Sequence, residues 1–186
     1  MTIAVKDIKR LCPTNMEAIV WGENCQLRYS NVKFFGVMDY TTNITLFNKQ
    51  NISDPDGFRT VVRDFMGNLS REAAFGSSSD RYALDEDVKY RENENISGLV
   101  QCTRDLSRND CNICLQNAIL DIQTCCYFYR GARVLSRSCY LRYELYHLSE
   151  PVALPGKQPS KRKFTFSATL FVSYRPLQHS RHRLLL

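Results

Sequence analysis

The sequence has no long apolar run. Its longest candidate, residues 164–174, covers about eleven residues and includes Ser and Thr, whereas a helix needs about 20 apolar residues to cross a bilayer. This excludes a membrane span in the chain. The first twelve residues also lack the apolar core of a signal peptide, because charged side chains interrupt the stretch TIAVKDIKRL. We therefore expect no signal peptide in this chain.

The motifs of several enzyme classes are also missing. The chain has no Gly-rich phosphate loop, no Gly-x-Ser-x-Gly and no His-Glu-x-x-His. Its carboxylate cluster, Asp85-Glu86-Asp87, is interpreted as the charge of an exposed edge strand. We therefore expect no catalytic residue and no cofactor.

An excess of basic charge is missing from most of the chain, although the net charge is +6. Seven Lys and Arg and no acidic residue lie in residues 151–186, which leaves 25 − 7 = 18 basic against 19 acidic residues elsewhere. The excess thus belongs to a tail, which we interpret as solvated and disordered. A basic interaction arm is the alternative, but no nucleic-acid partner is expected.

Cysteine, in contrast, is abundant. Six of the eight cysteines lie between Cys102 and Cys139, and a dense, even set in a small unit indicates disulfides and an oxidising compartment. Zinc is the alternative, since Cys111 and Cys114 have knuckle spacing, but no second pair and no His at ligand spacing follow. No metal site is therefore expected. Four Asn-x-Ser/Thr sequons, possible glycosylation sites, also favour secretion: Asn43, Asn51, Asn68 and Asn95.

An internal repeat divides the chain. Cys12 is followed after twelve residues by Cys25-Gln-Leu-Arg-Tyr, and Cys126 after twelve residues by Cys139-Tyr-Leu-Arg-Tyr. Only the second copy has a long preceding sequence. We therefore expect residues 1–38 to be the poorly folded end of a first module, 39–150 a complete second module and 151–186 a foreign tail, as in a truncated gene product.

The second module reads as α+β. Ser53 and Pro55 indicate a helix start, and an apolar stripe follows at helical spacing up to Leu69. Ser107 caps a second helix, in which Ile113 is expected to face inward. Strands are predicted at these ranges: 82–90, 96–102, 133–136 and 139–148. The result is two helices packed on a small antiparallel sheet.

These motifs resemble a known plant family. The carrying residues are Gln101-Cys102-Thr-Arg-Asp-Leu-Ser, Cys111-x2-Cys114, Cys125-Cys126, Gly131-Ala-Arg-Val and Ser138-Cys139-Tyr-Leu-Arg-Tyr-Glu144. They are similar to the ginkbilobin-homologous, or stress-antifungal, domain of cysteine-rich receptor-like kinases and cysteine-rich repeat secretory proteins. The resemblance implies an α+β fold and, for the parent family, a secreted, apoplastic location.

The resemblance also implies a set of bridges. Carried over, the family pairing gives Cys102–Cys111 and Cys114–Cys139. Phe47 takes the place of the first family cysteine, so the usual partner of Cys126 is absent. Two outcomes are open for Cys125 and Cys126: a vicinal bridge or two free thiols. The family partners of Cys12 and Cys25 are also missing from this sequence.

A binding site follows from the same family. Its antifungal member binds mannose through an Asn, an Arg and a Glu, which correspond here to Asn48, Arg133 and Glu144. An amide, a guanidinium and a carboxylate together suit vicinal sugar hydroxyls. The alternative is purely structural: Arg133 and Glu144 pair across adjacent strands, and Asn48 serves a turn.

Three functions are weighed on these grounds. The first is a secreted binding or receptor-ectodomain-type module in stress or defence signalling, whose partner is another receptor ectodomain. The second is a mannose-binding antifungal lectin-like protein, whose partner is a cell-wall or fungal mannose-type glycan. The third, an intracellular zinc or redox protein, requires free thiols or bound metal.

Overall fold

The computed structural model describes residues 2–22, 25–146, 148 and 171–174. It divides into two compact units, residues 1–34 with 162–186 and residues 35–161. The division after Phe34 falls four residues before the sequence-based boundary at residue 38 (38 − 34). Each unit is described by itself.

The first unit contains a helix and a three-stranded antiparallel sheet of order β2-β1-β8. Its elements are α1 (Thr2–Leu11), β1 (Glu17–Trp21), β2 (Gln26–Ser30) and β8 (Phe171–Tyr174). Ile8, Cys12 and Val20 form its small core. From the sequence, poor folding was expected before residue 38 and disorder after 151. The structure gives residues 2–30 a helix and two strands, and the tail one strand; the rest of the tail lies outside the described residues.

The internal repeat is also a structural repeat. Shifted by 114 residues (126 − 12), β1 and β2 correspond to two strands of the second unit, β6 (Gly131–Ser136) and β7 (Cys139–Glu144). One hydrogen-bond pattern recurs. The Tyr29 hydroxyl donates to the carbonyls of Cys12 (3.1 Å) and Asn15 (3.2 Å). The Tyr143 hydroxyl donates likewise to the carbonyls that follow at the shifted positions, at 2.9 and 3.0 Å.

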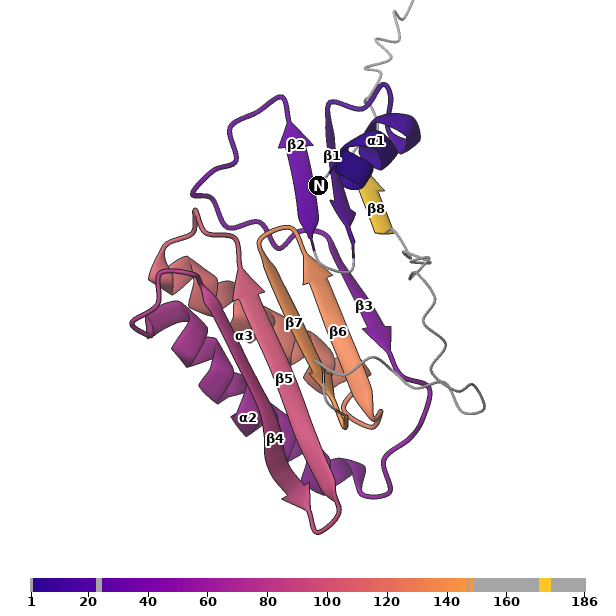
Figure 1. Cartoon of the computed structure of the whole chain (residues 1–186), viewed down its shortest axis with the longest axis vertical. Helices are drawn as coiled ribbons and strands as arrows, with labels where there is room; N and C mark the ends of the chain where they lie inside the picture. The colour runs from indigo at the N-terminus through magenta and orange to yellow at the C-terminus, as the bar shows by residue number, and fades with distance from the viewer. Residues whose placement is uncertain (1, 23–24, 147, 149–170, 175–186) are drawn as a thin grey trace, which may run out of the picture. The chain divides into compact units, whose positions relative to one another are not determined.

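The second unit is a five-stranded antiparallel sheet of order β3-β6-β7-β5-β4 with two helices on one face (Figure 1). Besides β6 and β7 its elements are β3 (Asn43–Phe47), α2 (Pro55–Phe75), β4 (Tyr82–Arg91), β5 (Glu94–Cys102) and α3 (Arg108–Cys125). Phe58, Val62 and Met66 of α2 are fully or almost fully buried in one core with Tyr143. This confirms the predicted α+β class.

Three local predictions differ from the structure. The N-cap of α2 is Asp54, whose Oδ1 accepts from the amide of Gly57 at 3.2 Å, rather than Ser53. The Ser53 hydroxyl instead accepts from Nη1 of Arg91 at 2.7 Å. Ile113 is 46% exposed, not inward-facing, and β7 ends at Glu144 rather than at residue 148.

Two bridges attach the start of α3 to the sheet. Cys102–Cys111 joins β5 to α3, and Cys114–Cys139 joins α3 to β7. Cys102 and Cys139 are direct register partners on neighbouring strands, so both bridges converge on one point of the sheet. The structure also forms the vicinal bridge Cys125–Cys126. Among the described residues Cys12 is a buried free thiol and Cys25 an exposed one.

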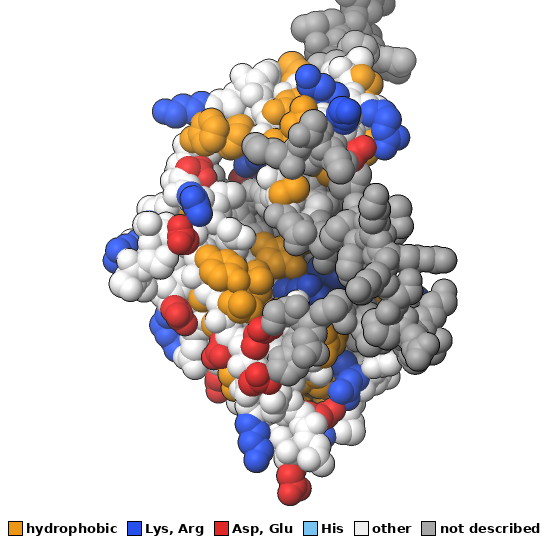
Figure 2. Space-filling view, in the orientation of Figure 1, with side chains coloured by type: hydrophobic (Ala, Val, Ile, Leu, Met, Phe, Trp, Pro, Cys, Tyr) orange, Lys and Arg blue, Asp and Glu red, His pale blue; other side chains and the backbone are white. Residues whose placement is uncertain are grey.

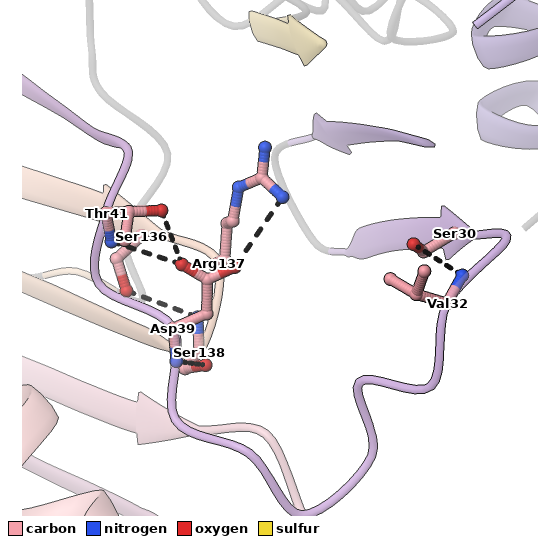
Figure 3. Close-up of polar contacts among 7 residues, drawn as sticks. All are labelled: Ser30, Val32, Asp39, Thr41, Ser136, Arg137 and Ser138. Atoms are coloured by element: carbon pink, nitrogen blue, oxygen red, sulfur yellow. Dashed lines mark hydrogen bonds and ion pairs between the residues drawn. The ribbon is translucent and has the colours of Figure 1, made fainter. Parts of the chain in front are cut away.

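A polar cluster holds the segment before β3 against the turn between β6 and β7 (Figure 3). The amide of Asp39 donates to the Ser138 hydroxyl at 2.9 Å, and Arg137 pairs with the Asp39 carboxylate at 3.6 Å. The buried Ser136 hydroxyl accepts from the amide of Cys139 at 2.9 Å. These contacts support β3 in its place beside β6.

Candidate saccharide site

The three residues predicted to bind a sugar line one pocket of about 220 Å³. Asn48 follows β3 directly, Arg133 lies on β6 and Glu144 ends β7. Four further residues complete the lining: Leu46, Phe47, Ala132 and Tyr146.

Strand register brings these residues together from distant parts of the chain. Leu46 of β3 is the partner of Arg133, and Gly131 of β6 is the partner of Glu144. The Asn48 amide donates to the Gly131 carbonyl at 2.8 Å, which extends the β3–β6 pairing by one more bond. The pocket therefore depends on the pairing of β3, β6 and β7.

Glu144 is the buried acceptor of the pocket, with only 5% of its surface exposed. Its Oε1 accepts from Nε of Arg142 at 3.1 Å. Its Oε2 is buried and has no hydrogen-bond partner among the described residues. Burial raises the pKa of the Glu144 carboxyl. The charges of Arg142 and Arg133 and a contact with the Tyr146 hydroxyl oppose that rise. An unpaired carboxylate oxygen is costly to bury, and a sugar hydroxyl would satisfy it.

Gly131 makes room for this carboxylate. A Cβ atom added there would overlap Oε2 of Glu144 and lie 2.5 Å from its Cδ. Any side chain at Gly131 would thus displace the carboxylate, which gives the Gly131-Ala-Arg-Val motif a steric reason for its glycine.

Arg133 and Asn48 supply donors. The ion pair of Glu144 is with Arg142 on the same strand. Arg133, the cross-strand partner of the structural alternative, acts on Glu144 only through its charge. In the described part of the chain no hydrogen bond or ion pair engages the Arg133 guanidinium, so its N–H groups are available. Asn48 does serve a turn, since its Oδ1 accepts from the Gln50 amide at 3.0 Å, but its Nδ2 remains available for a ligand.

Two aromatic rings border the pocket, and sequence reasoning named neither as a site residue. Phe47 is 46% exposed and Tyr146 38%. The Phe47 ring stacks on Tyr129 at 4.3 Å between centroids, and the Tyr146 hydroxyl accepts from Nη2 of Arg142 at 2.9 Å. Tyr146 follows Glu144 by two residues. Residues two apart in an extended segment share one face, so this spacing is the sequence feature that could have identified Tyr146.

Within the described ranges no three potential ligands gather to hold a metal ion, and no helix there has the length and apolarity of a membrane span. The four sequon asparagines are all exposed on the surface, as glycosylation requires. Their modification remains a prediction.

The fold and the pocket define a disulfide-stapled α+β module with a small, partly polar pocket at one end of its sheet. The chain belongs to the salt stress response/antifungal family, whose model matches residues 46–146. This confirms the resemblance seen in the sequence.

The relatives are secretory proteins and receptors. The chain is 39% identical over 143 residues to an antimicrobial ginkbilobin-2-like protein of Castanea crenata, covering 77% of this chain and 58% of that protein. It is 36% identical to cysteine-rich repeat secretory protein 38 of Arabidopsis thaliana, covering 77% and 56%. Cysteine-rich receptor-like protein kinase 26 of the same plant is 32% identical, covering 82% of this chain and 23% of the kinase. The chain thus spans little more than half the length of its secretory relatives.

A solved structure shares the fold. The tandem DUF26 ectodomain of the Arabidopsis thaliana cysteine-rich receptor-like protein PDLP8 matches with a TM-score of 0.63 and 25% identity, covering 77% of this chain and 62% of that one. The homologous modules are therefore those of secretory proteins and receptor ectodomains.

Proposed function

We propose that this protein is a secreted recognition module that binds, rather than transforms, a mannose-type sugar in the Asn48–Arg133–Glu144 pocket. Its role would lie in stress or defence. The relatives support the extracellular setting, since they include secretory proteins and a receptor kinase. The antimicrobial name of the Castanea crenata relative supports the defence role.

One observation carries the proposal. An unpaired carboxylate oxygen of Glu144, an available guanidinium of Arg133 and a free amide N–H₂ of Asn48 line the same pocket. A sugar with vicinal hydroxyls donates to the first and accepts from the other two, and such charge-assisted bonds are the stronger ones. The exposed Phe47 and Tyr146 rings offer apolar faces for the C–H side of the sugar ring.

The size of the pocket limits what it holds. Its 220 Å³ is below the range of about 300–1,000 Å³ typical of drug-sized ligands. We therefore expect one sugar residue inside the pocket.

Isothermal titration of the refolded protein with methyl α-mannoside tests the proposal, with methyl α-galactoside as the stereochemical comparison. Arg133→Ala and Glu144→Gln should each weaken mannoside binding about tenfold or more, from the loss of one charged hydrogen bond. Arg63→Ala, on the exposed face of α2, is the matched control and should bind as the wild type does. Absence of mannoside binding at millimolar concentration would refute the proposal.

A second receptor ectodomain is the alternative partner. Tyr82 and Leu84 on the edge strand β4 are 38% and 40% exposed, which favours a protein contact there. Cross-linking of the module to a relative's ectodomain, lost in Leu84→Asp but kept in Glu144→Gln, would support this alternative over the sugar.

A further inference from the structure

A second hollow lies on the same module, with a volume of about 470 Å³. It is built from the turn between β4 and β5, the start of β5, Arg130 just before β6, and the two residues that follow β7. Glu92, Glu94, Asn95, Ser97 and Arg130 supply its polar groups, and Tyr146 closes one side. Nothing in the sugar pocket described above requires this hollow.

The two hollows are neighbours across the sheet. Tyr146 lines both of them. In addition, Ser97 in the second hollow is the register partner of Glu144 in the first, and Glu144 is in turn the partner of Gly131. Adjacent strands lie about 4.8 Å apart, so a path from one hollow to the other crosses a single strand spacing beside the Tyr146 ring.

The chemistry of the second hollow suits a neutral polyol. Arg130 Nη1 pairs with Glu94 Oε1 at 2.7 Å, and both side chains keep about 30% of their surface exposed (33% and 28%). The half-exposed pair offers donors and acceptors side by side. Glu92 adds a second carboxylate, so the hollow is net negative and disfavours phosphate or an acidic sugar. Figure 2 shows acidic side chains beside an apolar patch on the face that looks toward the viewer.

We propose that the two hollows form one groove and that the ligand is a neutral mannose-type oligosaccharide of at least two units. The first unit enters the Glu144 pocket. The second lies against Tyr146 and the Glu94–Arg130 pair. This inference rests on the proposed function, because it extends the same site.

The test compares one sugar unit with two. Protein made without N-glycosylation is required, because the sequon residue Asn95 lines the second hollow. It is titrated with methyl α-mannoside and with the α1,2-, α1,3- and α1,6-linked mannobioses. At least one mannobiose should bind about tenfold more tightly than the monosaccharide, the effect of one additional charged hydrogen bond.

One variant tests whether the additional affinity for mannobiose arises in the second hollow. Glu94→Gln removes one carboxylate charge from the second hollow and should bring the mannobiose affinity down to that of the monosaccharide, while methyl α-mannoside binding stays unchanged. Glu72→Gln, exposed on α2, is the matched control and should alter neither affinity.

The outcomes separate the two claims. If methyl α-mannoside binds but no mannobiose binds more tightly, or if Glu94→Gln weakens both ligands equally, the groove is refuted and the single-sugar pocket stands. If no sugar binds at all, the proposed function itself fails.

Discussion

Replacing Gly131 with alanine should move the Glu144 carboxylate, the hydrogen-bond acceptor, out of the proposed sugar pocket. The added Cβ would overlap Oε2 of Glu144, so the carboxylate must rotate away from its buried position. The backbone at Gly131 has no positive φ, and alanine therefore meets no conformational strain there. The perturbation is purely steric and acts on one side chain.

The expected loss follows from the bond that Glu144 would make. A hydrogen bond to a charged group contributes about 1.5–3 kcal/mol, and each 1.4 kcal/mol is about a factor of ten in affinity. Gly131→Ala should therefore weaken methyl α-mannoside binding by about 10- to 150-fold. Arg142 would also lose its ion pair with Glu144, so a smaller loss of folding stability accompanies the change.

The assay is isothermal titration alongside urea unfolding, which separates lost binding from lost folding. Gly67→Ala is the matched control: the atom nearest to a Cβ there is Nη1 of Arg71 at 3.9 Å. In the interior of α2 alanine is favoured over glycine by about 1 kcal/mol, so this variant should bind normally and unfold at slightly higher urea. A Gly131→Ala protein that is folded and keeps wild-type affinity would refute the reasoning.

Three further predictions concern stability and pH. Replacing Cys114 and Cys139 together by alanine opens a bridge between residues 25 apart and should cost about 3.5 kcal/mol in urea unfolding; a cost below 1 kcal/mol would contradict it. Ser136→Ala removes the acceptor of the buried Cys139 amide and should cost about 1–3 kcal/mol by the same measurement; an unchanged midpoint would speak against that role. Burial raises the pKa of Glu144, so its ionised form destabilises the fold above that pKa and the penalty disappears as pH falls through it. Mannoside affinity should decline over the same pH window, and Glu144→Gln should remove that decline in a titration series.

Much of the second unit could be predicted because its signals are local. The α2 stripe and the Ser107 cap of α3 depend on residues three or four apart, and both helices form where their patterns indicated. The strand β3, Asn43–Phe47, was missed because it is only five residues long, and its pairing with β6 lies about 90 residues away in the sequence. The cap of α2 was misplaced by one residue: the helix begins at Pro55, so Asp54 is the cap. Arg91 of β4 contacts both Ser53 and Asp54 and therefore does not distinguish them.

Phe47, the residue expected in place of a family cysteine, also separates what the sequence predicts from what the structure adds. The resemblance to the family predicts that Phe47 stands where the family carries a bridging cysteine. Only the structure shows what the ring does: it stacks on Tyr129, whose amide donates to the Cys126 carbonyl at 3.1 Å. An aromatic pair contributes about 0.5–1.5 kcal/mol, compared with about 2–4 kcal/mol for a typical bridge. The aromatic pair thus holds the turn after α3 more weakly than a disulfide would hold it.

The sequence by itself determined the family, the repeat and the types of residue that could bind a sugar, because cysteine spacing and short motifs are one-dimensional features. The tertiary structure alone decided that Asn48, Arg133 and Glu144 share a pocket. It also decided that Glu144 forms its ion pair with Arg142, and that Tyr146 lines both this pocket and a second hollow. The physical reason is strand register: pairing between β3, β6, β7 and β5 brings together residues far apart in the chain, and their contacts exist only once the sheet has formed.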